Sequence, residues 1–342
     1  MSDRRRSGRR TAAAVLLPAL LLAAAAGCPR SEAAAGAAVG RFALAQELAD
    51  FDPLGAWNTV AQVLQRQVYE GLVEYRYGGG LNEFDGLLAE SWSVGGDGRE
   101  WRFRLRPDAA FYDPGPEPLW PGGRRPVRAA DVVASLLRLA DPRLEAGGWF
   151  VLEGLVEGLD ELRAAAAAGD PAALAVFDRG GAPDRPAGLR AVDDHTVLLR
   201  LARPAPDLLM RLASPYCVVV PAEAWRRTEP ALRDHPVGSG PFFLAEWEPR
   251  QRAVFRAVPG WRRQADGFGP LPHLDEAVFT AVLEGSTRTL LFERGEIDRL
   301  PPAQDSFARL VRDGRPAPEL AARGVRLVVT ETPDLSMLVL NQ

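Results

Sequence analysis

The sequence contains no lysine, and its positive and negative charges nearly balance. All 41 basic residues among its 342 positions are arginines, and with 45 acidic residues the formal net charge at pH 7 is −4. Proteins that bind nucleic acid usually present a basic surface to the phosphates. The charge balance therefore argues against a nucleic-acid partner. We attribute the missing lysine to a biased genome rather than to a function.

Cysteine is almost absent, with two residues in the whole chain. Cys28 falls in the N-terminal segment, so Cys217 has no partner for an internal disulfide. The apolar neighbours of Cys217 at residues 216–220 predict a strand in which the thiol is a small core side chain. A nucleophilic or metal-binding cysteine would need partners nearby in sequence, and none is found there.

Motifs of enzyme active sites are missing as well. Gly238-Ser239-Gly240 is followed by Pro241 instead of the Gly-Lys-Ser/Thr of a phosphate loop, so we interpret it as a turn. The Asp193-Asp194 pair falls at a predicted hairpin tip, where aspartate suits the turn geometry. No G-x-S-x-G elbow is present. The three histidines fall in separate turns without metal-site spacing: His195, His235 and His273. We therefore expect that the protein is not an enzyme and that it holds neither a metal ion nor a cofactor.

One apolar run is long, and it lies at the N-terminus. Arginines at residues 4–10 precede the run at 11–26, which is too short to span a membrane comfortably. It ends in Ala25-Ala26-Gly27-Cys28, which resembles a bacterial lipobox, with Ala25 in place of the usual leucine. We expect a signal peptide at 1–27, lipidation of Cys28 and a tether at 28–40. The alternative is an ordinary secretory signal. Both predict export.

The remaining composition is that of a globular protein, with 47% apolar and 25% charged residues. A glycine-rich turn at 95–98 precedes Trp101, Phe103 and Leu105, which alternate with arginines and predict a strand with one core face. Residues 129–140 have helical spacing, with Asp131 in the first turn. The tryptophans are candidates for the core or for a ligand cleft, because aromatic walls suit non-covalent capture: Trp57, Trp92, Trp101, Trp120, Trp149 and Trp261.

Periodicity and breaker residues place the other elements. Helices are predicted at 59–69, twice within 152–177, at 207–212 and at 287–294, the last between Ser286 as N-cap and Gly295. Strands are predicted at 41–45, 72–75, 189–192, 196–201, 242–247, 253–258, 276–283, 325–330 and 336–340. Hairpins and helices interleave without βαβ regularity, which indicates an α/β or α+β arrangement with an antiparallel subdomain.

Six blocks, in order, resemble the family 5 extracellular solute-binding proteins of ABC transporters, the dipeptide/oligopeptide/nickel-binding class. The blocks are Asp52-Pro53 with VYEGL at 68–72, the strand pair at 87–106, the helix at 129–139, DDHTVLLRLARPAPDLL at 193–209, PVGSGPF at 236–242 and FERGEID at 292–298. There are two local departures. Arg128 stands where the family usually has a Thr or Ser helix cap, and the loop at 112–125 is longer and rich in proline.

The resemblance implies an α/β fold of the periplasmic-binding-protein type II class, in which two lobes close on a ligand. It places the core of lobe I at 41–60 and 187–280, an inserted subdomain at 61–186, and the incomplete start of lobe II at 281–342. Because the chain stops with no turn, cap or polar tail after the predicted strand at 336–340, we expect a truncated copy of a longer protein, with the second lobe only partly present.

The resemblance also implies a function. The protein would capture a peptide or similar small solute on the periplasmic or cell-surface side, as a lipid-anchored monomer, and deliver it to ABC permease subunits. In peptide binders, the segment after Asp-Pro pairs with an extended ligand, which here points to Trp57, Asn58 and Thr59. The choice of ligand is not indicated. A solute-sensing lipoprotein of the same fold, a non-functional truncated fragment and a secreted hydrolase are the alternatives, and the last lacks a nucleophile–base pair.

Overall fold

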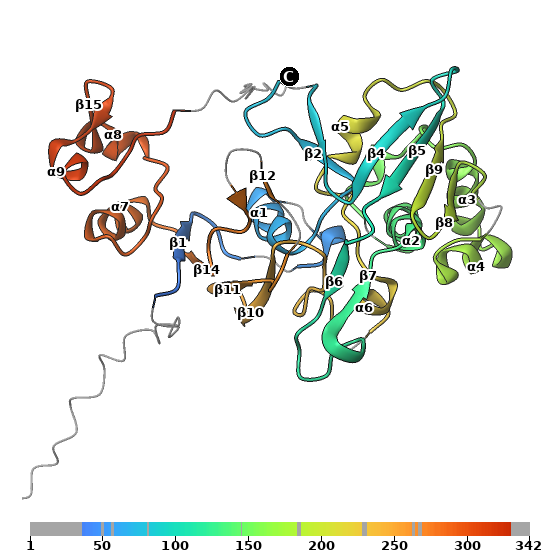
Figure 1. The fold of residues 1–342 in the computed structure, drawn as a ribbon, viewed down its shortest axis with the longest axis horizontal. Helices are drawn as coiled ribbons and strands as arrows, with labels where there is room; N and C mark the ends of the chain where they lie inside the picture. Colours follow the sequence, from blue (N-terminus) through green and yellow to red (C-terminus); the bar gives the residue numbers. More distant parts are fainter. Residues whose placement is uncertain are drawn as a thin grey trace, which may run out of the picture. The chain divides into compact units, whose positions relative to one another are not determined.

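A computed structural model of the chain describes residues 36–48, 51–55, 58–80, 82–144, 146–182, 186–227, 231–261, 264–265 and 269–329. Contacts divide the chain into Met1–Gly36 and Ala37–Gln342, and the fold below belongs to the second unit. Two four-stranded sheets organise this unit (Figure 1). In the described ranges, every helix is too short or too polar to cross a membrane.

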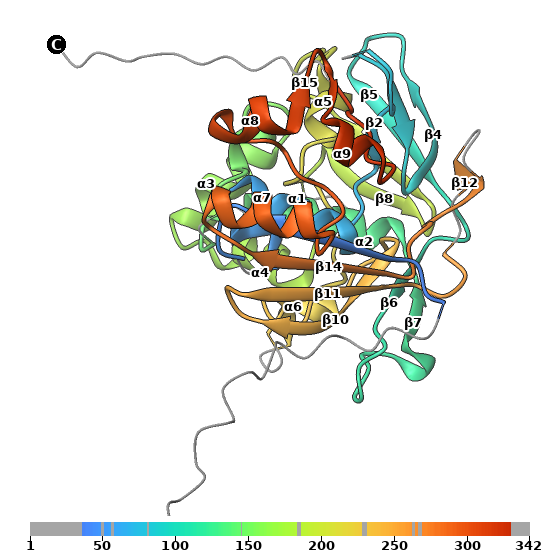
Figure 2. The ribbon, with the colours of Figure 1, turned by 90° about the vertical axis from the view of Figure 1, so that its left-hand side faces the viewer.

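The first sheet has the strand order β1 (Val39–Leu44), β14 (Glu276–Ala281), β11 (Arg252–Ala257), β10 (Phe242–Glu248). Strands β1 and β14 are parallel, whereas β14, β11 and β10 pair antiparallel and run side by side in Figure 2. Helix α1 (Thr59–Val68) packs on β10. The core that it shares with this sheet includes the fully buried rings of Phe51 and Phe255 and the side chain of Leu64.

The second sheet has the order β4 (Ala89–Val94), β5 (Glu100–Leu105), β9 (Thr196–Arg200), β8 (Leu189–Asp193), and every pair is antiparallel. The alternation predicted for β5 is confirmed, since Trp101, Phe103 and Leu105 are buried and the intervening arginines are exposed. Helix α2 (Ala129–Ala140) packs against β8 and β9. The sheet thus combines strands from both sides of the predicted boundary between residues 186 and 187.

The predicted helices within 152–177 are confirmed as α3 (Leu159–Ala167) and α4 (Pro171–Arg179), and the helix at 207–212 as α5 (Leu208–Leu212). Further elements were not predicted. They are η1 (Pro53–Gly55), η2 (Pro121–Gly123), η3 (Trp149–Val151), α6 (Ala222–Arg226), α8 (Gln304–Leu310) and α9 (Pro318–Ala321). Small hairpins pair β2 (Val73–Tyr75) with β3 (Phe84–Gly86), β6 (Ala110–Tyr112) with β7 (Arg124–Pro126), β12 (Gln264–Ala265) with β13 (Gly269–Pro270), and β15 (Val311–Arg312) with β16 (Arg315–Pro316).

Helix α2 begins without a hydroxyl cap, at the position of Arg128. A guanidinium cannot accept a hydrogen bond, so the side chain of Arg128 leaves the first N–H groups of the helix uncapped. Instead, the carboxylate of Asp131 accepts from the N–H of Arg128 at 2.8 Å and from both terminal nitrogens of Arg125 at 2.8 and 2.9 Å. The side chain of Arg125 is 17% exposed and that of Asp131 9%. A shielded ion pair therefore anchors the start of the helix.

Three predictions about local structure are wrong. Residues 216–220 form a turn and an irregular segment instead of a strand. Their main-chain hydrogen bonds go to separate residues rather than to one neighbouring strand; the N–H of Val219, for example, donates to the carbonyl of Glu70. Ser286 is not an N-cap, since α7 (Gly285–Arg294) already begins at Gly285. Residues 325–329 are not a strand, and the side chains of Val328 and Val329 are exposed. The strand predicted at 336–340 lies outside the described residues.

The loop between β6 and β7 is organised by a buried carboxylate. Asp113 accepts hydrogen bonds from the N–H groups of Leu119 at 2.9 Å and Gly115 at 3.2 Å, and its Oδ1 lies 3.0 Å from Nε2 of His235. Burial raises the pKa of Asp113, but the bonds with His235, Leu119 and Gly115 outweigh burial and bring the pKa below the ordinary 3.8. The ionised form therefore stabilises the loop.

We expect Asp113→Asn to reduce the free energy of unfolding by about 1–2 kcal/mol at neutral pH. A carboxyl with a lowered folded-state pKa stabilises the fold above its unfolded-state pKa, and this stability is lost as the pH falls through the folded-state value. The difference between wild type and variant should therefore shrink below the ordinary pKa of 3.8. Urea titrations of the wild type and the variant at neutral and acidic pH measure this difference in the free energy of unfolding. An equal difference at both pH values would contradict the lowered pKa of Asp113.

Candidate functional site

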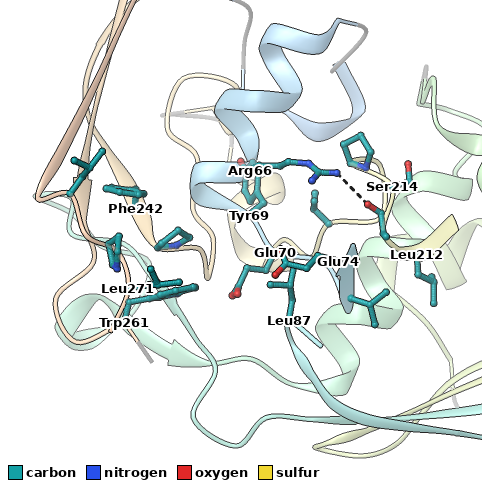
Figure 3. Close-up of a pocket in the computed structure, with 18 of the residues that line it drawn as sticks. Arg66, Tyr69, Glu70, Glu74, Leu87, Leu212, Ser214, Phe242, Trp261 and Leu271 are labelled. Atoms are coloured by element: carbon teal, nitrogen blue, oxygen red, sulfur yellow. Dashed lines mark hydrogen bonds between the residues drawn. The ribbon is translucent and has the colours of Figure 1, made fainter. Parts of the chain in front are cut away.

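A cavity of about 360 Å³ lies at the C-terminal end of α1. Its walls come from the end of α1 and strand β2, from the segment after α5, from the start of β10, and from the chain between β11 and β14 (Figure 3). These segments are far apart in the sequence. The cavity size falls in the range of small-ligand sites, about 300–1,000 Å³.

The end of α1 is positioned by unusually close main-chain packing against the PVGSGPF turn. The N–H of Gly240 donates to the carbonyl of Val68 at 2.8 Å. A Cβ atom on Gly238 would lie 2.0 Å from the same carbonyl oxygen, so this position requires glycine. The approach brings Pro241 and Phe242, which follow the turn directly, into the cavity wall.

Most of the lining is apolar, with Phe242, Trp261 and Leu271 on one side in Figure 3 and Leu212 on the other. The indole Nε1 of Trp261 donates to the carbonyl of Ser239 at 2.9 Å, which fixes the ring beside the turn. Of the six tryptophans considered from the sequence, Trp261 lines this cavity, while Trp101 is buried in the core under β5.

A few charged groups interrupt the apolar lining. Arg66 donates from Nη2 to the carbonyl of Ala213 at 3.3 Å, at the end of the cavity near Ser214. The carboxylates of Glu70 and Glu74 lie between the two walls in Figure 3. Glu70 is 3% exposed, whereas Glu74 is half-buried. His273 also belongs to the lining. Such a surface suits non-covalent capture of a small solute.

Two of the three residues predicted to bind the ligand, Asn58 and Thr59, lie at the other end of α1. Asn58 is the N-cap of this helix, where its Oδ1 accepts from the N–H of Ala61 at 2.8 Å. Thr59 is exposed, and neither residue lines the cavity. Trp57 and the predicted lipidation site Cys28 lie outside the described residues.

Tyr69 and Glu70 line the cavity but were not predicted to do so from the sequence. Both belong to the VYEGL block, which was used to identify the resemblance to solute-binding proteins. The signal that could have found them is Gly71. A Cβ atom there would lie 3.2 Å from the carbonyl of Cys217, which shows that two distant segments meet at this point. Among the described residues, no three His, Cys, Asp or Glu side chains lie close enough together to hold a metal ion.

The carbonyl of Cys217 faces Gly71 of the cavity lining, whereas the side chain of Cys217 lies in the core. The residue is 3% exposed, and burial raises the pKa of the thiol to about 12. The prediction of a small core side chain is therefore confirmed. The thiolate fraction at neutral pH is too low for a nucleophile.

We expect the thiol of Cys217 to resist labelling in the folded protein. In the Cys28→Ser variant at about pH 8, roughly one Cys217 side chain in ten thousand would be a thiolate, because the pKa is about 12. A disulfide exchange reagent should therefore react with it very slowly. One equivalent should react after unfolding in guanidinium chloride. Rapid labelling of the folded protein would show that the thiol is accessible.

The geometry can be compared with known proteins. Residues 83–342 match the family model described as bacterial extracellular solute-binding proteins, family 5 Middle. The chain is 26% identical over 257 residues to the dipeptide-binding protein of Escherichia coli K12, covering 72% of this chain and 41% of that protein. It is 29% identical over 231 residues to SapA, a probable ABC transporter periplasmic-binding protein of the same strain, covering 66% and 37%.

Solved structures show the same fold. The periplasmic binding protein DppA of Helicobacter pylori, solved with the peptide STSA, superimposes with a TM-score of 0.63 at 21% identity, covering 80% of this chain and 48% of that one. OppA of Haemophilus influenzae, solved with the peptide RPPGFSPFR, gives a TM-score of 0.61 at 23% identity and the same coverage. The predicted type II periplasmic-binding fold is therefore confirmed. The chain spans less than half the length of each of these relatives.

Proposed function

This chain belongs to the bacterial extracellular solute-binding proteins of family 5, and from that premise we propose that it captures a peptide or similar small solute for an ABC importer. The observation that carries the proposal is the cavity at the end of α1, which lies in the fold shared with relatives solved with short peptides. Its apolar walls and few charged groups match what non-covalent recognition requires. The fold and family are those of binding proteins rather than of enzymes.

We propose that the chain works on the periplasmic or cell-surface side, as a monomer anchored through a lipid on Cys28. In this proposal, residues 41–60 and 187–280 are the core of the first lobe and 61–186 its inserted subdomain, while 281–342 begin the second lobe. The proposal keeps Trp57, Asn58 and Thr59, in the segment that leads into α1, as the residues whose main chain pairs with an extended ligand. Closure of two lobes would exclude water before the solute meets the permease.

A peptide titration tests the binding function. The protein, made with Cys28→Ser, is titrated with tri- and tetrapeptides while its tryptophan fluorescence and calorimetric heat are followed. Because the chain spans less than half the length of its relatives, we expect weak binding, with Kd about 0.1–1 mM. The heat-capacity change should be negative, since apolar surface is buried. If a diverse peptide set gives neither heat nor a fluorescence change, peptide capture by these residues is refuted.

A further inference from the structure

We propose that the cavity at the end of α1 takes one large, uncharged side chain of the solute, of about the size of phenylalanine. The inference rests on the proposed function and deepens it, because it names the part of the solute that the cavity holds. Three features of the described lining carry it: two leucines outside the hydrophobic cores, main-chain groups that are already bonded, and charged groups that already interact within the chain.

Leu87 and Leu271 bring apolar surface to the cavity from distant parts of the chain. Leu87 lies between β3 and β4, whereas Leu271 follows β13 and belongs to the wall of Phe242 and Trp261 in Figure 3. Both leucines are half-buried, and neither belongs to a hydrophobic core formed by the described residues. Covering such side chains with apolar atoms of a solute removes them from water, which is favourable.

The main-chain groups of the walls are largely bonded within the protein. The carbonyl of Gly71 accepts from the N–H of Leu88 at 3.2 Å, and the carbonyl of Pro241 accepts from the N–H of Val258 at 2.9 Å. A proline has no N–H to donate, and three separate segments of the lining contribute one: Pro215, Pro241 and Pro272. Strand-like pairing with a peptide requires main-chain donors and acceptors that are available. These walls therefore suit a side chain of the solute better than its backbone.

The charged groups of the lining do not select the solute. The guanidinium of Arg66 donates to the carbonyl of Ala213 at 3.3 Å. Glu70, Glu74 and His273 each interact with other groups of the protein. A charged group of the solute would have to compete with these interactions, and it would also lose its hydration on entering the cavity. An uncharged side chain avoids both penalties.

The volume of the cavity limits the size of that side chain. About 360 Å³ lies near the lower end of the range for small-ligand sites, about 300–1,000 Å³, which suits one large side chain rather than a whole tetrapeptide. Three aromatic residues contribute to the walls, and aromatic pairs gain more than their buried area alone provides: Tyr69, Phe242 and Trp261. A phenyl ring therefore fits the lining in both size and character.

The test compares two tripeptides with free termini, Ala-Phe-Ala and Ala-Ala-Ala, whose dissociation constants with the Cys28→Ser protein are measured by NMR titration. We expect Ala-Phe-Ala to bind about tenfold more tightly, because its ring leaves water on entering the cavity. Ala-Arg-Ala should bind more weakly than Ala-Phe-Ala. In Leu271→Ala and in Leu87→Ala, the preference for Ala-Phe-Ala over Ala-Ala-Ala should fall to about threefold, because part of the apolar wall is removed.

Leu290→Ala is the matched control, since Leu290 is 44% exposed on α7 and outside the cavity lining. It should keep the tenfold preference, and thermal melts confirm that each variant is folded. Three results would each overturn the inference: equal affinities of the wild type for Ala-Phe-Ala and Ala-Ala-Ala, tighter binding of Ala-Arg-Ala than of Ala-Phe-Ala, or an unchanged preference in both cavity variants. If none of the three peptides binds to the wild type, the proposed function itself fails.

Discussion

Replacing Gly238 by alanine should destabilise the fold more than any other substitution proposed for this protein. The added Cβ atom would lie 2.0 Å from the carbonyl oxygen of Val68. Both groups belong to the backbone, so no side-chain rotation relieves the clash, and the turn must move away from α1. That movement would break the bond from Gly240 N–H to Val68 and the bond from Tyr112 N–H to the carbonyl of Gly238. We expect a loss of at least about 3 kcal/mol in the free energy of unfolding.

Urea unfolding followed by circular dichroism measures the loss, and Gly96→Ala is the control. Gly96 lies in the turn between β4 and β5, with no atom near the position that a Cβ would take. Alanine there should change stability by no more than about 1 kcal/mol, and it can even stabilise by restricting the unfolded chain. If Gly238→Ala unfolded at the same urea concentration as Gly96→Ala, the close approach of turn and helix would be disproved.

The regular parts of the fold were predictable because their signals are local. The alternation of Trp101, Phe103 and Leu105 with arginines specifies a strand with one buried face, and β5 has that face. The helical spacing after Arg128 likewise gives α2, with Asp131 in its first turn. Each of these patterns is complete within about ten residues, and binary patterning of that kind decides element type.

The cavity was not predictable because no segment of the sequence contains it. Its shape depends on Gly71 meeting the carbonyl of Cys217, on Gly240 bonding to Val68, and on Trp261 bonding to Ser239. The composition of the apolar run around Cys217 predicts a strand, yet in the fold it packs as an irregular segment against Glu70 and Gly71. Propensity is a weak prior where tertiary contacts decide.

The Asp52-Pro53 block was identified from the sequence, but the role of Asp52 itself was not predicted. In the sequence analysis the block served to locate the ligand-binding segment that follows it. In the structure, the carboxylate of Asp52 forms a two-pronged ion pair with Arg138 of α2, with Oδ1–Nη1 2.9 Å and Oδ2–Nη2 2.7 Å. The side chains are 27% and 14% exposed. The pair therefore joins the loop before α1 to the helix under the second sheet.

We expect Asp52→Asn to lower the free energy of unfolding by about 2–3 kcal/mol, because it leaves the shielded guanidinium of Arg138 without its anion. Glu47→Gln provides the comparison. It breaks the pair of Arg250 and Glu47, which has a similar 2.7 Å distance but side chains 75% and 53% exposed. An exposed pair contributes about 0–1 kcal/mol and is screened by salt.

Urea titrations of both variants at low and high sodium chloride separate the two environments. The loss in Asp52→Asn should persist in salt, because ions do not penetrate the shielded pair, whereas the small loss in Glu47→Gln should vanish. The double variant Asp52→Asn with Arg138→Met should recover part of the loss, since replacing both partners removes the uncompensated charge. Losses of equal size in Asp52→Asn and Glu47→Gln would mean that burial does not strengthen the pair. A large loss, by contrast, would show that the block before α1 acts first as a structural tie, which holds the start of α1 in place for any ligand that pairs with it.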